Sequence, residues 1–347
     1  MCTANVVNEF HQHSLQNFVF DSNSGILYVG GVNIIYKLAS NLHQDAAVTL
    51  GPRHDIVECS DSSSFSLDCT LATETSDCVN QALMLDADNG VLIACGTLYS
   101  GSCAKVSTAD FSVAEYIYRP VVPNDGSKSV AVLIAPGFTG SNMLYVGASY
   151  SANEAVAIHD RVGLFSIREL LTFEIASVET ASKSSVQILP AFQDNFEMHF
   201  IRVYHLNDHV YFFFRRPVSV GSGEVTSHVL RVCTSDREMH SIVELRLQCS
   251  VNDVIYPYLR DITLTDFSPP LQMQDGSSIN GPTLVGIFTS TAEDAGNSAV
   301  CLYQMTGPSG VESAFLSVIK SCFSGSGQTG PEYIVNPETC IETVSCF

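Results

Sequence analysis

One unit recurs in the first half of the chain: an apolar strand, a polar turn, a second apolar strand and then glycine. It occupies Phe18–Gly30, Ala82–Gly96 and Val130–Gly147, so the closing glycines lie 66 and 51 residues apart. Asn, Asp and Gly fill the turns and β-forming residues flank them, a pattern typical of β-hairpins. The interval is close to the roughly 40–50 residues of one four-stranded propeller blade plus loops. The repeat therefore predicts a radial array of hairpin-built sheets.

The second half of the chain continues this pattern and brings the count to about five blade-like units. Further strands are expected at Met198–Tyr204, Val210–Phe214, Val229–Cys233, Thr283–Phe288 and Ala299–Tyr303. Strands such as Tyr211–Phe214 are apolar at successive positions, which indicates sheets buried on both faces. Helical periodicity is confined to Ser166–Thr172 and Val311–Ser321. The chain is predicted to be all-β.

Two polar stretches, Ser60–Ser66 and Phe267–Pro282, are predicted to be surface loops. Neither is long enough to link two domains, so residues 1–347 are expected to form one domain. No stretch of 18 apolar residues occurs, which excludes a membrane span within this chain.

The charge balance limits the class of partner. The chain has 16 Lys and Arg against 36 Asp and Glu, a formal net charge of −20. Nucleic acids and anionic membranes are poor partners for such a surface because both require a basic face. The negative field favours a basic patch on another protein or a cation.

The cysteines indicate an oxidising compartment. There are 12 of them, an even number, and no Cys-x-x-Cys pair that would suggest a zinc ribbon or a thioredoxin-type motif. Disulfides are the better interpretation and place the protein outside the cell or in the secretory lumen. The first residues, Met1–Glu9, show neither a basic start nor an apolar run, so the chain is expected to be a fragment that lacks its leader.

No catalytic or metal site is predicted. His205 and His209 have a spacing that suits a metal pair on a helix, but they flank a predicted turn and lack further ligands. Asp21, Asp86 and Asp88 occupy hairpin turns, where carboxylates bond their own backbone; the loop pattern of a calcium site is missing. Neither a nucleophile elbow nor a phosphate-binding loop is present.

Six motifs in chain order carry a family resemblance. They are Ile26–Leu38 with Thr49–Pro52, Val79–Asp86, Ala94–Cys103, Ser227–Cys233, Ser298–Tyr303 and Ser321–Gly327. In order and in cysteine spacing they resemble the plexin family, in its semaphorin-type (sema) propeller, over nearly the whole chain. The first is similar to the plexin strand pair YVGAxNxIYKL, and Ala94–Cys103 is similar to CGSxxQGxC.

The resemblance implies a seven-bladed β-propeller of the sema type, of which this chain supplies about five blades. Residues 1–347 would then be a sema domain that is incomplete at its C-terminal end, without a second domain. Because an incomplete ring leaves edges uncovered, the strands around Phe18 and Tyr28 should expose apolar groups.

The resemblance also implies a disulfide framework: Cys59–Cys69, Cys95–Cys103, Cys233–Cys346, Cys249–Cys301 and Cys322–Cys340. Cys2 and Cys78 match nothing in the family pattern. They either pair with each other or reflect sequence near the true start of the protein.

The implied function is that of the extracellular ligand-binding propeller of a plexin-like semaphorin receptor, which signals at the cell surface in processes such as axon guidance. The implied partners are a semaphorin-like protein ligand and, in addition, a co-receptor or a second receptor copy. The module would lie on the extracellular face of the plasma membrane within a longer single-pass receptor, with no direct membrane insertion by this chain and no nucleic-acid partner. No enzyme activity and no cofactor are expected. The alternative is a secreted semaphorin-like ligand or soluble decoy; nothing in the sequence favours a propeller enzyme.

Three arginines are candidate partner contacts, because arginine is enriched at binding hot spots and basic residues are few here. They are Arg168, Arg215 and Arg216. In the family the partner surface lies on the third and fourth blades, which corresponds broadly to Glu154–Arg216. Arg215 and Arg216 are equally consistent with an edge strand kept soluble by charge.

Overall fold

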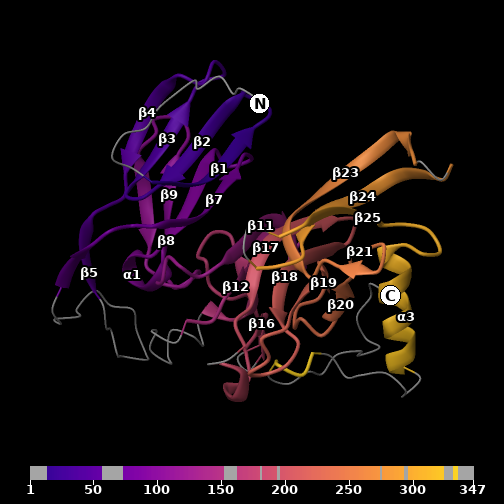
Figure 1. Ribbon diagram of the computed structural model, residues 1–347. Coiled ribbons are helices and arrows are strands. Elements are labelled where there is room, and N and C mark those ends of the chain that lie inside the picture. The colour runs from indigo at the N-terminus through magenta and orange to yellow at the C-terminus, as the bar shows by residue number, and fades with distance from the viewer. Residues whose placement is uncertain are drawn as a thin grey trace.

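The computed structural model describes residues 14–56, 73–151, 162–179, 182–193, 196–273, 276–292, 296–323 and 331–334. Five antiparallel sheets follow one another along the chain, and we number them 1 to 5 in that order. They fan out as an open arc, with sheet 1 at one end and sheet 5 at the other (Figure 1). This arrangement confirms the predicted all-β array of hairpin-built sheets.

In every sheet the first strand in the sequence lies at the inside of the arc, and the following strands lie successively further out. Sheet 1 contains β1 (Leu15–Asp21), β2 (Ile26–Gly31), β3 (Ile34–Leu38) and β4 (Gln44–Thr49). Sheet 2 contains β7 (Asn80–Asp86), β8 (Val91–Gly96), β9 (Cys103–Ser107) and β10 (Val113–Ile117). Sheet 3 contains β11 (Val130–Pro136), β12 (Asn142–Ala148), β13 (Phe165–Glu169) and β16 (Ser185–Val186).

Sheet 4 contains β17 (His199–Leu206), β18 (His209–Pro217), β19 (Val225–Cys233) and β20 (Val243–Leu247). Sheet 5 has three strands, β23 (Tyr258–Gln272), β24 (Ser278–Thr289) and β25 (Ser298–Gln304). The first strand of each sheet, which we call its inner strand, contacts the inner strand of the next sheet: β1 with β7, β7 with β11, β11 with β17, and β17 with β23.

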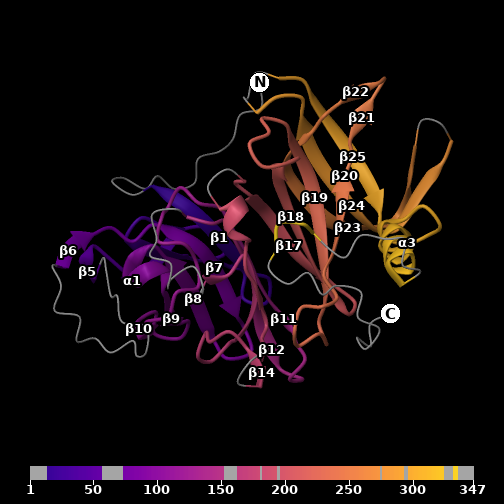
Figure 2. The same ribbon diagram turned by 90° about the horizontal axis from the view of Figure 1, so that it is seen from below.

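Short strand pairs and helical elements lie outside the five sheets. Three two-stranded ladders pair β5 (Arg53–Ile56) with β6 (Thr73–Ser76), β14 (Ser177–Glu179) with β15 (Ser182–Lys183), and β21 (Ser250–Val251) with β22 (Val254–Ile255). From below, β5 and β6 lie at one side of the molecule and β21 and β22 at the other (Figure 2). The helical elements are α1 (Leu98–Gly101), the 3-10 turn η1 (Pro190–Phe192) and α3 (Val311–Phe323).

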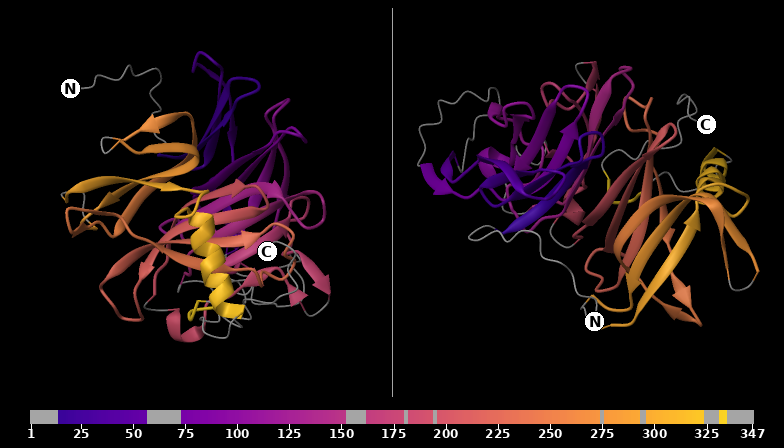
Figure 3. Two further views of the ribbon diagram at one scale, coloured as in Figure 1. Left: turned by 90° about the vertical axis from the view of Figure 1, so that its right-hand side faces the viewer. Right: turned by 90° about the horizontal axis from the view of Figure 1, so that it is seen from above.

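The helix predicted near the end of the chain is confirmed, and the other predicted helix is wrong. Helix α3 stands at the outer margin of the arc and packs against β20 (Figure 3), with Phe315 and Ile319 buried in the core shared by sheets 4 and 5. The segment Ser166–Thr172 instead contributes β13, which pairs with β12 along its whole length. A pattern of seven residues is too short to distinguish a helix from a strand buried on both faces. None of the helices among the described residues has the length and apolarity needed to cross a membrane.

The loop predicted at Phe267–Pro282 is also wrong for most of its length. Strand β23 continues to Gln272 and β24 begins at Ser278, so the segment is a long hairpin. Pro269 and Pro270 fall where the register shifts between Phe267 and Leu271. Proline lacks a backbone N–H, and an irregular stretch of strand accommodates it without losing a ladder hydrogen bond.

Sheets bury both faces, which explains the strands that are apolar at successive positions. In β18, Phe212 and Phe214 belong to the core shared with sheet 3, whereas Tyr211 and Phe213 belong to the core shared with sheet 5. Successive side chains of a strand point to opposite faces, so each junction takes every second residue.

At Gly30 and Gly147, two of the three repeated glycines, the next sheet comes close to the end of the second strand, whereas at Gly96 the close atoms belong to Cys78 and Val79, which precede β7 of the same sheet. A Cβ added at Gly147 would lie 2.5 Å from the ring of Phe200 and 3.0 Å from that of Phe212, both in sheet 4. At Gly30 it would lie 2.4 Å from Oδ1 of Asn80 in sheet 2. Any side chain at these positions would push the neighbouring sheet away.

The two ends of the arc expose apolar side chains. Phe18 is 71% exposed and Phe20 is also exposed on sheet 1, and Ile287 and Val300 are exposed on sheet 5. The expectation for Phe18 is therefore confirmed. It is wrong for Tyr28, which is buried against sheet 2 because it lies on the opposite face of sheet 1, beside Val19.

Replacing Gly147 with alanine should destabilise the protein by about 1–3 kcal/mol, because the added methyl group overpacks the junction between sheets 3 and 4. Gly223→Ala is the matched control, since a Cβ at Gly223 meets nothing within 4 Å. The free energy of unfolding in urea measures both effects. Equal stability of the two variants would contradict the close approach described here.

Candidate partner-binding face

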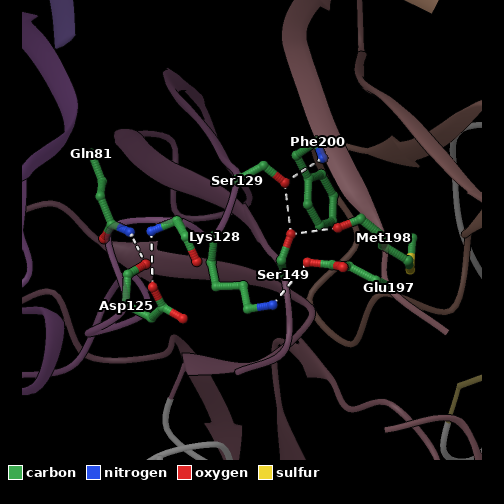
Figure 4. Close-up of polar contacts among 9 residues, drawn as sticks. Gln81, Asp125, Lys128, Ser129, Ser149, Glu197, Met198 and Phe200 are labelled. Carbon is green, nitrogen blue, oxygen red and sulfur yellow. Dashed lines mark hydrogen bonds and ion pairs between the residues drawn. The ribbon is translucent and has the colours of Figure 1, made fainter. Parts of the chain in front are cut away.

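The inner strands β7, β11, β17 and β23 all begin on the same face of the arc, which we call the strand-start face. Figure 4 shows the polar contacts where sheets 2, 3 and 4 meet there. The hydroxyl of Ser149 donates to the carbonyl of Met198 at 2.5 Å and lies 2.7 Å from the hydroxyl of Ser129. The backbone N–H of Phe200 donates to Ser129 Oγ at 2.7 Å. Two serines of sheet 3 thus satisfy the backbone at the start of β17.

A single serine makes the equivalent contact between sheets 4 and 5. Ser227 Oγ donates to the carbonyl of Pro257 at 2.6 Å and accepts from the N–H of Leu259 at 2.9 Å. Ser227 is completely buried. In both junctions serine hydroxyls bond a carbonyl and an N–H two residues apart at the start of the incoming inner strand: two hydroxyls share these contacts between sheets 3 and 4, and one makes both between sheets 4 and 5. We call these contacts the serine latches.

At the first two junctions, amide side chains instead of serines bond the backbone of the neighbouring sheet. Asn17 Nδ2 donates to the carbonyl of Asn80 at 2.9 Å, joining β1 to β7. Gln81 Nε2 donates to the carbonyl of Asp125 at 2.8 Å, joining β7 to the segment before β11. Each neighbouring pair of sheets is therefore tied by a side chain that bonds the backbone of its neighbour.

Ion pairs lie beside the latches. Lys128 Nζ lies 2.8 Å from Glu197 Oε1, linking sheets 3 and 4 (Figure 4). Arg202 contacts both carboxylate oxygens of Asp261 at 2.9 and 3.3 Å, linking the inner strands of sheets 4 and 5. The hydrogen bond from Arg202 lowers the pKa of Asp261. These pairs are largely exposed, so they position the sheets more than they stabilise them.

Arg168 is not available to a partner, which corrects the prediction made from the sequence. It lies in β13, is only 2% exposed, and donates to the carbonyls of Val162 and Phe173 and to the hydroxyl of Ser166. Burial lowers its pKa. The guanidinium is used inside sheet 3 to bond backbone carbonyls around the end of the strand.

Arg216 is likewise used internally. Its Nε lies 2.7 Å from Glu244 Oε1, and its guanidinium stacks over the rings of Phe196 and Tyr333 at 5.4 and 5.2 Å. Glu244 also contacts His228 Nδ1 at 2.5 Å and accepts from the hydroxyl of Tyr333 at 2.7 Å. Burial opposes ionisation of Glu244, but these contacts outweigh it and lower its pKa. Arg216 therefore neutralises a buried carboxylate.

Arg215 differs from the other two. It is half-buried, and its Nε has no hydrogen-bond partner among the described residues. It faces sheet 5 and lies across from His199 in β17 and Ser227 in β19. Burial and then the nearby guanidinium of Arg260 lower the pKa of Arg215. No carboxylate in the part of the chain that the structure describes forms an ion pair with it.

Together Arg215, His199 and Arg260 form what we call the basic cluster, at the junction of sheets 4 and 5. The pKa of His199 is lowered by burial first and by Arg215 next. Arg260 is held by Thr289 Oγ1 at 2.8 Å and by backbone carbonyls of the following turn. Sequence reasoning found Arg215 but missed the other two, because only the strand register and the packing of two sheets bring them together.

The histidine pair considered as a metal site lies at the turn between β17 and β18. His205 pairs with Val210 and His209 with Leu206, so the two side chains are not arranged as on a helix. Burial lowers the pKa of His209 to about 4. Among the described residues no group of three or more His, Cys, Asp or Glu side chains could hold a metal ion.

Two disulfides lie within the described residues, and both are pairs that the family resemblance implies. Cys95 and Cys103 are directly opposite each other in β8 and β9, with Cα atoms 4.0 Å apart. Cys249–Cys301 joins the segment after β20 to β25, and so connects sheets 4 and 5.

The remaining cysteine pairings stay predictions. Cys59–Cys69 lies outside the described residues, as do Cys340 and Cys346, the expected partners of Cys322 and Cys233. Cys2 is also outside them. Cys78 is a free, buried thiol, and burial raises its pKa to about 11.

No family model matches the chain. Among curated proteins it is 26% identical to plexin A3 of Danio rerio over 364 aligned positions, covering 95% of this chain and 19% of that protein. It is 28% identical to plexin-B1 of Homo sapiens over 247 positions, covering 68% of this chain and 11% of that protein. The chain thus spans less than a fifth of the length of these relatives.

Solved structures give the same fold. The extracellular region of plexin A4 superimposes with a TM-score of 0.79 and 21% identity, over 96% of this chain and 38% of that one. Extracellular domains 1-2 of Drosophila semaphorin 1a give 0.56 and 16%, over 88% of this chain and 54% of that one. The five sheets are therefore blades of a sema-type propeller, which confirms the predicted fold class, and the chain is a sema-domain-like region with distant homology to the plexins.

Ser227→Ala should lower the free energy of unfolding by about 1–3 kcal/mol, because it leaves a buried carbonyl and a buried N–H without a partner. Ser219→Ala, at an exposed position after β18, is the control and should change stability little. Urea unfolding measures both. If the two variants unfold alike, the serine latch does not hold sheets 4 and 5 together.

Alkylation of Cys78 by iodoacetamide should be slow in the native protein at pH 8 and should speed up only as the pH nears 11, since the thiolate is the reactive form. In urea the same residue should react with its ordinary pKa near 9. Mass spectrometry of the peptide that contains Cys78 follows the reaction. Equal native and unfolded rates at pH 8, or a disulfide at Cys78, would contradict the buried free thiol.

Proposed function

We propose that this plexin sema-domain-like region is the ligand-binding module of an extracellular receptor and that it binds a semaphorin-like protein. One observation carries the proposal: the backbone matches the extracellular region of plexin A4 at a TM-score of 0.79, against 0.56 for semaphorin 1a. The greater likeness to the receptor supports a receptor over a secreted ligand. Non-enzymatic recognition by a sema-type propeller is the activity that follows.

The same relatives support an extracellular location for the module. The matched region of plexin A4 is extracellular, and the disulfides Cys95–Cys103 and Cys249–Cys301 suit an oxidising compartment. We therefore place the module on the extracellular face of the plasma membrane, where binding of a protein ligand initiates signalling.

The basic cluster is our candidate for the contact with the ligand. It lies in sheets 4 and 5, at the edge of the segment where the family resemblance locates the partner surface. Arg215 is half-buried yet has no carboxylate partner among the described residues, in a chain with 36 Asp and Glu. A carboxylate of the ligand would accept a charge-assisted hydrogen bond from the Arg215 guanidinium in a partly desolvated setting. Arg215 would then be a hot spot of the interface.

Surface plasmon resonance with a dimeric semaphorin-like ectodomain tests the proposal on the whole protein that contains this chain. Binding is expected, and Arg215→Gln should weaken it about tenfold, the effect of losing roughly 1.4 kcal/mol. Arg246→Gln, which removes an exposed arginine from β20 of the same sheet, is the control and should leave the affinity within about twofold.

The outcomes separate two claims. Absence of any binding by the unmodified protein, across representative semaphorin ectodomains, contradicts the receptor function. Binding that is equally strong in the Arg215→Gln and Arg246→Gln variants leaves the function standing and removes the basic cluster from the interface.

A further inference from the structure

A cavity of about 610 Å³ opens between sheets 2 and 3, at the opposite end of the strands from the serine latches. It is enclosed by the turn between β7 and β8, the turn between β11 and β12, and the end of β13. Its size is within the roughly 300–1,000 Å³ of ordinary ligand sites. Neither the basic cluster nor the strand-start face contributes to it.

The floor of this cavity is apolar. Val91 from β8 and Leu170 after β13 form its half-buried surface, over the buried side chains of Ile93 and Met143. Leu171 stands at the rim and is 76% exposed, the largest exposure among the large apolar side chains of the described residues. The cavity therefore offers apolar contact both inside and at its mouth.

Carboxylates approach the cavity from both sheets. Asp86 and Asp88 come from sheet 2 and Glu169 from sheet 3. Asp86 accepts from Asn89 at 2.8 Å, Asp88 from Asn142 across the junction at 3.4 Å, and Glu169 from Thr172 at 3.2 Å. These donors are neutral. None of the three carboxylates forms an ion pair with a cation within the described ranges.

Lys105, the only basic residue among the described lining residues, forms no ion pair with them. Its ammonium group donates to the carbonyl of Leu171 at 2.6 Å and lies 5.2 Å from the centre of the Phe173 ring. It is thus used to tie sheet 2 to the segment after β13. The cavity keeps an excess of negative charge above an apolar floor.

We propose that this cavity receives an arginine or lysine side chain of a partner protein. The methylene stem of such a side chain would lie against Val91 and Leu170, above Met143 and Ile93, and its cationic head would reach Asp88 and Glu169. Long basic side chains combine these two properties, an apolar stem and a charged tip. The net charge of −20 would steer a basic surface towards the site.

The exposed Leu171 favours a protein over a small free cation as the occupant. A side chain presented by a protein brings flanking residues that can cover the rim, whereas a small cation leaves Leu171 in water. The partner differs in charge from the one proposed for Arg215, which must supply a carboxylate, so this site is independent of the proposed ligand contact.

Calorimetric titration of the whole protein with two capped peptides, acetyl-Leu-Arg-Leu-amide and acetyl-Leu-Gln-Leu-amide, tests the proposal. The arginine peptide should bind about tenfold more tightly, the effect of two exposed charge contacts. Its binding should weaken with salt. It should shift the methyl signal of Met143 in protein labelled with ¹³C-methyl methionine.

The double variant Asp88→Asn and Glu169→Gln should abolish the preference for the arginine peptide. Both residues are exposed, so their neutral isosteres leave the fold intact. The matched control, Glu224→Gln with Asp253→Asn, removes the same charge at exposed positions in the loop before β19 and the turn between β21 and β22, and should keep the preference. Leu171→Ser should weaken both peptides.

Three results would overturn the proposal. One is equal affinity for the two peptides, and another is a preference that survives the double variant. The third concerns agmatine, an arginine analogue without flanking residues: binding as tight as that of the arginine peptide would assign the cavity to small organic cations instead of a protein.

Discussion

Backbone groups at the start of each inner strand are removed from water, because the sheets bury both faces and pack closely there. Such groups cost free energy unless they find a hydrogen-bond partner. Here the partner comes from the preceding sheet: Ser129 and Ser149 for β17, and Ser227 for β23. Gly147 allows the close approach of sheets 3 and 4. The arc of five sheets depends on this coupling between close packing and polar satisfaction at every junction.

The same requirement decides which polar side chains remain available for recognition. Arg168 is occupied by backbone carbonyls and Arg216 by a buried carboxylate, so neither can meet a ligand. Arg215, Asp88 and Glu169 form no ion pair within the described residues. The two candidate sites have opposite charge and lie at opposite ends of the strands. One module could therefore engage an acidic and a basic partner surface at once.

Local sequence patterns were enough to predict the fold, but not which side chains meet at the candidate site. Hairpins such as Phe18–Gly30 were predictable because Asp, Asn and Gly in a turn act locally. The close approach at Gly30 was not predictable, because it depends on a neighbouring sheet. The strand at Phe165–Glu169 was missed because a run this short is ambiguous. The burial of Arg168 and the proximity of Arg215 to Arg260 depend on strand register and on sheet packing. No local sequence pattern encodes either.

The central claim is that the junction hydrogen bonds hold the sheets as one cooperative body. Native-state hydrogen exchange tests it most directly, through the amides of Phe200 and Leu259, which donate to serine hydroxyls of the preceding sheet. If the junctions hold, both amides exchange as slowly as those in the middle of β18 and β19, through global unfolding. Exchange as fast as that of the exposed turn around Gly221 would show that the junctions open independently, and would contradict the account.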